Sequence, residues 1–133
     1  MPVSGDKPLI ALVEDDALMG SLVVQMLAQY GQPSVLYATG LGLLKSPALQ
    51  SYPTIIMDLS LPDIDGFELI QKLADRVPHA DLLLVTGRGN PTLESARTVA
   101  EGLGMRVVGA LNKPFSHLEL CLALQLQEPN SAP

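Results

Sequence analysis

The chain has 133 residues, 47% of them hydrophobic, so it is the size of one ordinary domain and can bury a sizeable core. Its net charge is −6 and its sequence pI is about 4.6, which argues against direct binding to nucleic acid or to an anionic membrane surface. The single cysteine, Cys121, cannot form an internal disulfide, and its place in an apolar run predicts a small buried side chain in a cytoplasmic protein.

The two ends of the chain differ from its middle. The first apolar run spans only residues 9–13, which is too short for a signal peptide or a membrane span. Residues 128–133 have the composition of a linker. We predict one domain over residues 8–127 with flexible ends at 1–7 and 128–133, the latter suited to joining an output domain.

Short apolar runs of strand length recur along the chain, each followed by a polar, glycine or proline break. They lie at residues 9–13, 35–37, 54–57, 82–85 and 107–111.

The segments between these runs favour helices. The first has apolar residues at helical spacing and a stop at Gly31; the stripe comprises Met19, Leu22, Val23, Met26, Leu27 and Tyr30. The second is uncertain because Pro47 falls inside it. The third is expected to end at or before Val77, because Pro78 follows.

The fourth segment is expected to begin with Asn90 as the N-cap and to end at Gly102 and Gly104. The fifth contains a conflict, since every second residue from 118 to 126 is leucine, which is the period of a strand. Ser116 and Glu119, three positions apart, form a capping-box pattern. We therefore predict a helix there.

Strands and helices that alternate five times predict an α/β fold with a doubly wound, five-stranded parallel sheet. Ligands of such sheets bind outside the carboxyl ends of the strands. The side chains that follow the predicted strands are Glu14, Asp15 and Asp16, then Asp58, Thr86 and Lys113.

Carboxylates that converge on one edge repel unless a cation lies among them. Oxygen ligands indicate a hard ion, and Asp15 with Asp58 suits Mg²⁺, which keeps several waters and takes one or two carboxylates. A calcium loop around Asp63 and Asp65 fails, because with Gly66 in the sixth place the first and twelfth ligands would be a leucine and a lysine. Nucleotide binding lacks its glycine-rich phosphate loop.

Phosphoryl transfer to a carboxylate needs a nucleophile, a metal, a cation and a hydroxyl donor. We expect Asp58 to be the nucleophile and Asp15 to hold Mg²⁺, with Glu14 acting through water. Lys113 would offset the charge of the phosphoryl oxygens and Thr86 would donate a hydrogen bond to them.

Four motifs of the sequence resemble those of response-regulator receiver domains from bacterial two-component signalling. They are residues 12–16 (LVEDD), 55–66 (IIMDLSLPDIDG), 83–87 (LLVTG) and 112–115 (NKPF), and the resemblance spans roughly residues 9–127. It implies a flavodoxin-like fold with strand order 2-1-3-4-5. It also implies a signalling switch, not an enzyme in the usual sense, although such domains assist their own phosphoryl transfer and dephosphorylation.

The resemblance further assigns roles to residues of this chain. Asp58 is expected to be phosphorylated by a histidine kinase or a phosphotransfer protein, and Glu14 and Asp15 to form the acidic pocket. The backbone carbonyl of Ser60 is expected to be a third metal ligand, and the bond between Lys113 and Pro114 to be cis.

One position departs from the family pattern. Three residues before the lysine these domains often have an aromatic residue that reports phosphorylation, whereas this chain has Ala110. Signal transmission is then expected to depend on Thr86, the fourth helix and the fifth strand. Arg88 occupies a position that in the family tunes how long the phosphoryl group survives.

The sequence raises two alternatives to a phosphorylated switch. The alanine leaves open a pseudo-receiver that only binds proteins. A Mg²⁺-dependent phosphohydrolase on a similar sheet is disfavoured because Ser60 stands where those enzymes usually have a second aspartate. We expect self-association through the fourth helix, fifth strand and fifth helix. Residues 104–115 faintly resemble receivers fused to cyclic-di-GMP phosphodiesterase domains.

Overall fold

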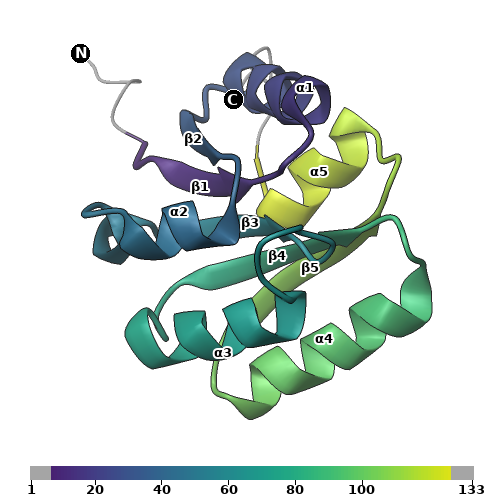
Figure 1. The fold of residues 1–133 in the computed structure, drawn as a ribbon. Helices are drawn as coiled ribbons and strands as arrows, with labels where there is room; N and C mark the ends of the chain where they lie inside the picture. Colours follow the sequence, from purple (N-terminus) through teal and green to yellow (C-terminus); the bar gives the residue numbers. More distant parts are fainter. Residues whose placement is uncertain (1–6, 127–133) are drawn as a thin grey trace.

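The computed structural model describes residues 7–126, which form one sheet between two layers of helices (Figure 1). The five strands are all parallel and lie in the order β2-β1-β3-β4-β5. The strands are β1 (Ile10–Val13), β2 (Ser34–Tyr37), β3 (Thr54–Asp58), β4 (Asp81–Thr86) and β5 (Arg106–Asn112). The helices are α1 (Ala17–Gln29), α2 (Gly40–Lys45), α3 (Gly66–Arg76), α4 (Asn90–Gly102) and α5 (His117–Leu124). The predicted fold class and strand order are thereby confirmed.

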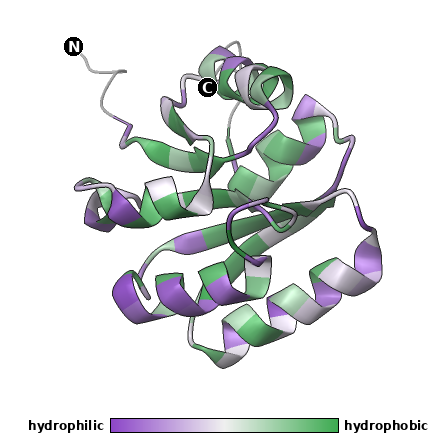
Figure 2. Cartoon of the chain, in the orientation of Figure 1, coloured by the Kyte–Doolittle hydropathy of each residue, from purple (hydrophilic) through white to green (hydrophobic). Residues whose placement is uncertain are grey.

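Each face of the sheet has its own hydrophobic core. One core joins the sheet to α2, α3 and α4, and the other joins it to α1 and α5. The central strands are therefore buried on both faces, which explains their continuous apolar runs. Figure 2 shows these apolar strands between helices whose outer faces are hydrophilic, most clearly on α3 and α4.

Three helix ends follow local sequence signals, two of them caps and one a proline. Asp16 caps α1 by accepting a hydrogen bond from the Met19 N–H. The helix α3 ends at Arg76, before the proline that was expected to stop it. The capping box of Ser116 and Glu119 is present at the start of α5, so the helix prediction for the leucine-rich segment is confirmed.

Two predicted details differ from the structure. Asn90 is the first residue of α4 and not its N-cap, which is Gly89 at φ 97°. That backbone conformation suits glycine. The uncertain second helix is short because α2 ends at Lys45, before Pro47, and a separate 3₁₀ turn follows at Leu49–Ser51. The tails predicted at residues 1–7 and 128–133 lie outside the described residues, apart from Lys7.

In the described part of the chain no helix combines the length and the apolar character needed to cross a membrane.

Candidate functional site

The site lies where β1, β3, β4 and β5 end on one edge of the sheet. Glu14 follows β1, Asp58 ends β3, Thr86 ends β4 and Lys113 follows β5. The parallel registers bring these ends together, since Val13 pairs with Met57 and Asp58 pairs with Val85. Residues that are far apart in the sequence thus share one small volume, as the strand-end analysis predicted.

Lys113 is the cationic centre of the site. Its Nζ atom lies 2.7 Å from Asp58 Oδ2 and 2.6 Å from Glu14 Oε1. Burial lowers the pKa of Lys113, but the hydrogen bonds to Asp58 and Glu14 outweigh burial and raise the pKa above its ordinary value. The lysine therefore stays protonated and can donate to both carboxylates. The Lys113–Pro114 peptide bond is cis, as expected.

Glu14 is buried beside this lysine. Burial is the largest influence on the pKa of Glu14 and raises it, the negative charge of Asp58 acts in the same direction, and the bonds to Lys113 and to the Asp16 N–H oppose both. The net shift is upward. The bond to Lys113 therefore does not fully offset the cost of keeping the Glu14 carboxylate charged in a buried place beside Asp58.

Asp58 is also buried, and the loop that follows it binds its side chain. The backbone N–H of Ser60 donates to Asp58 Oδ1 at 2.8 Å, while Oδ2 accepts from Lys113. Both oxygens of Asp58 are therefore oriented. A carboxylate held in this way is a well-positioned nucleophile.

Glu14, Asp15 and Asp58 can each place an oxygen atom within 4.8 Å of the others. Lys113 balances one of these three negative charges, and the remainder equals the charge of one divalent cation. Oxygen donors at this spacing fit Mg²⁺, which needs few protein ligands and retains waters. The donor set thus fits the ion that the sequence predicted.

Thr86, the last residue of β4, provides the hydroxyl at this edge of the sheet and is fully buried. Its Oγ1 atom accepts a hydrogen bond from the Arg88 N–H at 3.1 Å, so the hydroxyl hydrogen can be donated elsewhere. The Thr86 carbonyl accepts from the Lys113 N–H at 2.9 Å. Threonine and lysine are therefore fixed relative to each other through the backbone.

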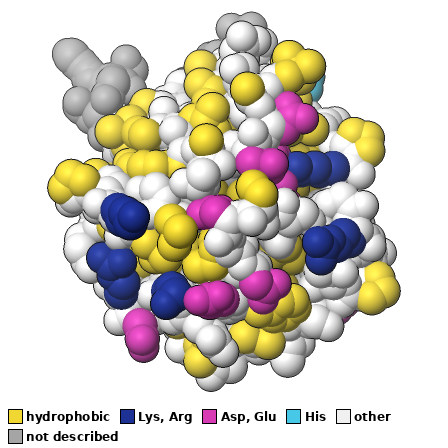
Figure 3. Space-filling model, in the orientation of Figure 1, with side chains coloured by type: hydrophobic (Ala, Val, Ile, Leu, Met, Phe, Trp, Pro, Cys, Tyr) yellow, Lys and Arg dark blue, Asp and Glu magenta, His cyan; other side chains and the backbone are white. Residues whose placement is uncertain are grey.

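Among the described residues, the histidines and the cysteine form no hydrogen bond or ion pair with the carboxylates, the lysine or the threonine of the site. His79 and His117 are exposed, and Cys121 is buried as expected, with its Sγ atom donating to the Leu126 carbonyl. Near the middle of the face drawn in Figure 3, acidic and basic side chains lie next to one another among apolar ones.

Two polar links near the site were not predicted. Asp63, considered only as a calcium ligand, binds backbone N–H groups at the start of α2. The amide of Asn112 donates to the side-chain oxygen of Asn90 and so joins the end of β5 to the start of α4. Partners so far apart in the sequence leave no local signal, and only the tertiary structure brings them together.

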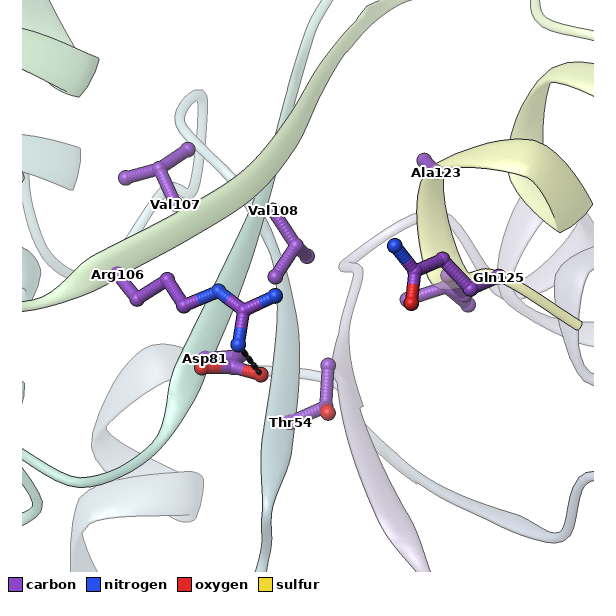
Figure 4. A pocket seen from close by; sticks show the side chains of 8 residues that line it. Thr54, Asp81, Arg106, Val107, Val108, Ala123 and Gln125 are labelled. Carbon is purple, nitrogen blue, oxygen red and sulfur yellow. Dashed lines mark ion pairs between the residues drawn. The ribbon is translucent and has the colours of Figure 1, made fainter.

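A separate hollow lies away from this site. It has a volume of about 230 Å³ and lies at the opposite edge of the sheet, where β3, β4 and β5 begin (Figure 4). Asp81 and Arg106, which are paired neighbours on β4 and β5, form an ion pair at 3.9 Å in its wall. We place the functional site at the carboxyl edge nevertheless, because the buried acids, the lysine and the hydroxyl converge there.

Comparisons with known proteins agree with this geometry. The model of the response regulator receiver domain matches residues 10–125. The transcriptional regulatory protein CreB of Escherichia coli is 34% identical over 110 residues, which cover 83% of this chain and 46% of that protein. The transcriptional regulatory protein PcoR, also of Escherichia coli, is 30% identical over 111 residues, covering 84% of this chain and 47% of that protein.

A solved structure shows the same shape. A response regulator from Colwellia psychrerythraea superposes with a TM-score of 0.73 at 28% identity, covering 89% of this chain and 94% of that one. The chain spans about half the length of the curated relatives it matches.

Proposed function

This chain belongs to the response regulator receiver domain family, and from that premise we propose that Asp58 accepts a phosphoryl group from a histidine kinase or a phosphotransfer protein. The supporting observation is the convergence of Asp58, Lys113 and Glu14, in which the lysine lies within 2.7 Å of both carboxylates. Receiver domains are signalling switches of two-component systems, and the chain is accordingly not expected to turn over a substrate.

In the proposed reaction, an oxygen atom of Asp58 forms a bond to phosphorus while the bond from phosphorus to the donor's imidazole nitrogen breaks. The electron pair of the broken bond leaves with the imidazole, and Asp58 becomes an acyl phosphate. Bound Mg²⁺ would neutralise negative charge on the phosphoryl oxygens. Glu14 and Asp15, with Asp58 itself and the Ser60 carbonyl, are the residues that we propose to hold it.

Lys113 and Thr86 have separate tasks in this proposal. Lys113 bonds to Asp58 before the reaction and would move to a phosphoryl oxygen as charge develops there. Thr86 would donate its hydroxyl hydrogen to another phosphoryl oxygen. Because the same hydroxyl accepts from the Arg88 N–H, its displacement would pull on the loop that leads into α4.

That loop offers a route for the signal where the family's aromatic residue is replaced by Ala110. The loop is tied at one end to Thr86 and at the other to Asn112 through Asn90. We propose that phosphorylation is transmitted through this loop to α4 and β5.

The test is intact mass measurement after incubation with acetyl phosphate and Mg²⁺. The wild type should gain the mass of one phosphoryl group, Asp58→Asn should gain none, and Asp75→Asn, which changes an exposed acid on α3, should behave as the wild type. An unmodified wild type would refute the proposal. It would favour the pseudo-receiver, which predicts equal partner affinity with and without phosphodonor.

An output domain joined to this chain is a further proposal. The relatives named above are transcriptional regulators, and this chain covers 46% and 47% of their length. We propose an output domain that regulates transcription. Any contact with DNA would be made by that domain, because the net charge of the present chain is −6. A cyclic-di-GMP phosphodiesterase partner stays a prediction from the sequence alone.

Self-association through α4, β5 and α5 is proposed from the surface of α5. Leu118 and Leu122 are 59% and 67% exposed and lie one helical turn apart. Apolar residues at such positions suit an interface. Sedimentation should show a dimer that Leu118→Gln with Leu122→Gln weakens; a monomer at high concentration in both phosphorylation states would contradict the interface.

A further inference from the structure

The loop that follows Asp58, residues 59–65, is fastened at its far end by Asp63. The Oδ1 atom of Asp63 accepts a hydrogen bond from the Gly40 N–H at 3.2 Å, and Oδ2 accepts one from the Leu41 N–H at 2.9 Å. Both donors belong to the first turn of α2. A single carboxylate thus connects the acceptor loop to a helix more than twenty positions earlier in the sequence.

These bonds are distinct from the ordinary cap of α2. The first four N–H groups of a helix have no partner within it. Here the Thr39 side chain satisfies one of them by accepting from the Gly42 N–H at 2.9 Å, while the Leu43 N–H makes the first bond within the helix, to the Thr39 carbonyl at 3.3 Å. Asp63 satisfies two others, those of Gly40 and Leu41. The helix cap and the loop anchor can therefore be removed separately by mutation.

Packing leaves the loop little freedom between its two ends. A Cβ atom on Gly40 would lie 2.5 Å from Ile64 Cγ2, so the loop presses directly against the start of α2. A Cβ atom on Gly66 would lie 2.9 Å from the Leu59 carbonyl oxygen, so the end of the loop closes on its beginning. A displacement at Asp63 would consequently reach the residues next to Asp58.

The near end of the loop contacts the acceptor itself. The Ser60 N–H donates to Asp58 Oδ1 at 2.8 Å. Only Leu61 and Pro62 stand between Ser60 and Asp63, and the proline ring fixes one backbone dihedral of this short connection. The orientation of the Ser60 peptide groups is thus set partly by Asp63.

We propose that Asp63 is a positioning residue of the acceptor site, which fixes the loop that presents Ser60 and thereby sets the affinity for Mg²⁺. The inference rests on the proposed function, because it concerns the metal that phosphorylation of Asp58 requires. Residues that orient metal ligands change metal affinity by roughly 10–100-fold when they are removed. The proposed cause is the pair of hydrogen bonds that Asp63 accepts from backbone N–H groups, and not its charge.

The first test measures phosphorylation by acetyl phosphate across a Mg²⁺ titration. Asp63→Ala should raise the half-saturating Mg²⁺ concentration about tenfold while the rate at saturating Mg²⁺ stays near that of the wild type. Asp63→Asn, which keeps one acceptor oxygen, should fall between them and serves if the alanine variant fails to fold. Thr39→Ala weakens the same helix and Asp65→Asn removes a charge from the same loop, and both should titrate as the wild type.

The second test needs no metal. In metal-free protein, hydrogen exchange of the Ser60 amide should be faster in Asp63→Ala than in the wild type and unchanged in Thr39→Ala. Unchanged exchange and Mg²⁺ dependence in Asp63→Ala, or the same effects in Thr39→Ala, would overturn the proposal. A wild type that is never phosphorylated would refute the proposed function alone, and the exchange comparison would still decide whether Asp63 holds the loop.

Discussion

Lys113 and Asp58 are 55 positions apart in the sequence, yet their side chains meet at 2.7 Å at the carboxyl edge of the sheet. The same lysine nitrogen binds Glu14. Its removal would leave two buried carboxylates without their shared cation.

We expect Lys113→Ala to lower the free energy of unfolding by about 1–3 kcal/mol, less than for a fully buried pair, because the lysine side chain is 21% exposed. Urea denaturation measures the loss. Lys72→Ala removes an exposed lysine paired with Glu68 on α3 and should cost well under 1 kcal/mol. Equal stability of both variants would contradict a structural role for Lys113.

Magnesium should stabilise the folded protein, because Lys113 balances only one of the three negative charges that Glu14, Asp15 and Asp58 bring together. A ligand at 100 times its dissociation constant adds about 2.7 kcal/mol, which a thermal melt detects. Asp15→Asn should lose most of this stabilisation.

The neighbouring Asp16 supplies the control, since its side chain caps α1. Asp16→Ser preserves a good cap and should keep the response to Mg²⁺. Equal loss in both variants would indicate general electrostatics and not a specific site.

Gly66 is expected to tolerate no side chain. A Cβ atom there would meet the backbone of Leu59 at 2.9 Å, so Gly66→Ala should destabilise by about 1–3 kcal/mol through overpacking. Gly102, at the end of α4, has open space around a Cβ atom. Gly102→Ala should therefore be neutral or slightly stabilising, and chemical denaturation of the two variants compares them directly.

The stability of the protein at alkaline pH should depend on Tyr52. Burial, followed by the hydrogen bond with Tyr37, raises the pKa of Tyr52 from 10.0 to about 12. In the unfolded chain Tyr52 ionises at a lower pH than in the folded protein. Its stabilising contribution is therefore complete below pH 10 and is lost as the pH rises toward 12.

Tyr52→Phe should lose about 1 kcal/mol at neutral pH with the hydrogen bond, and its stability should fall less steeply above pH 10. Tyr37→Phe removes the same hydrogen bond but keeps the buried hydroxyl of Tyr52, so it should retain part of the alkaline loss. Unfolding curves collected between pH 8 and pH 12 give both slopes; identical slopes in all three proteins would contradict the assignment.

Much of the fold was predictable because buried parallel strands are uninterrupted apolar runs. The site was predictable for a related reason: parallel strands end at the same edge, so Asp58 and Lys113 could be placed together without knowing the contacts between them. The capping box at Ser116 and Glu119 was sufficient to identify a helix against the alternating leucines.

The features that escaped prediction depend on distant contacts. Asparagine is a residue type that favours the N-cap position. In the structure, however, the Asn90 side chain pairs with Asn112, and Gly89 occupies the cap position. Asp63 stabilises a helix that precedes it by more than twenty residues. Such partners are chosen by the packed structure, and short sequence patterns do not encode them.

The strand that delivers Lys113 is also the last one among residues 7–126. During synthesis from the amino end, Glu14, Asp15 and Asp58 leave the ribosome long before the lysine that will lie between two of them. Until β5 joins the sheet, these acids have no counter-charge from the chain itself, and keeping them hydrated is easier than burying them. Formation of the acidic pocket should therefore be a late step of folding during synthesis, coupled to the pairing of β5 with β4.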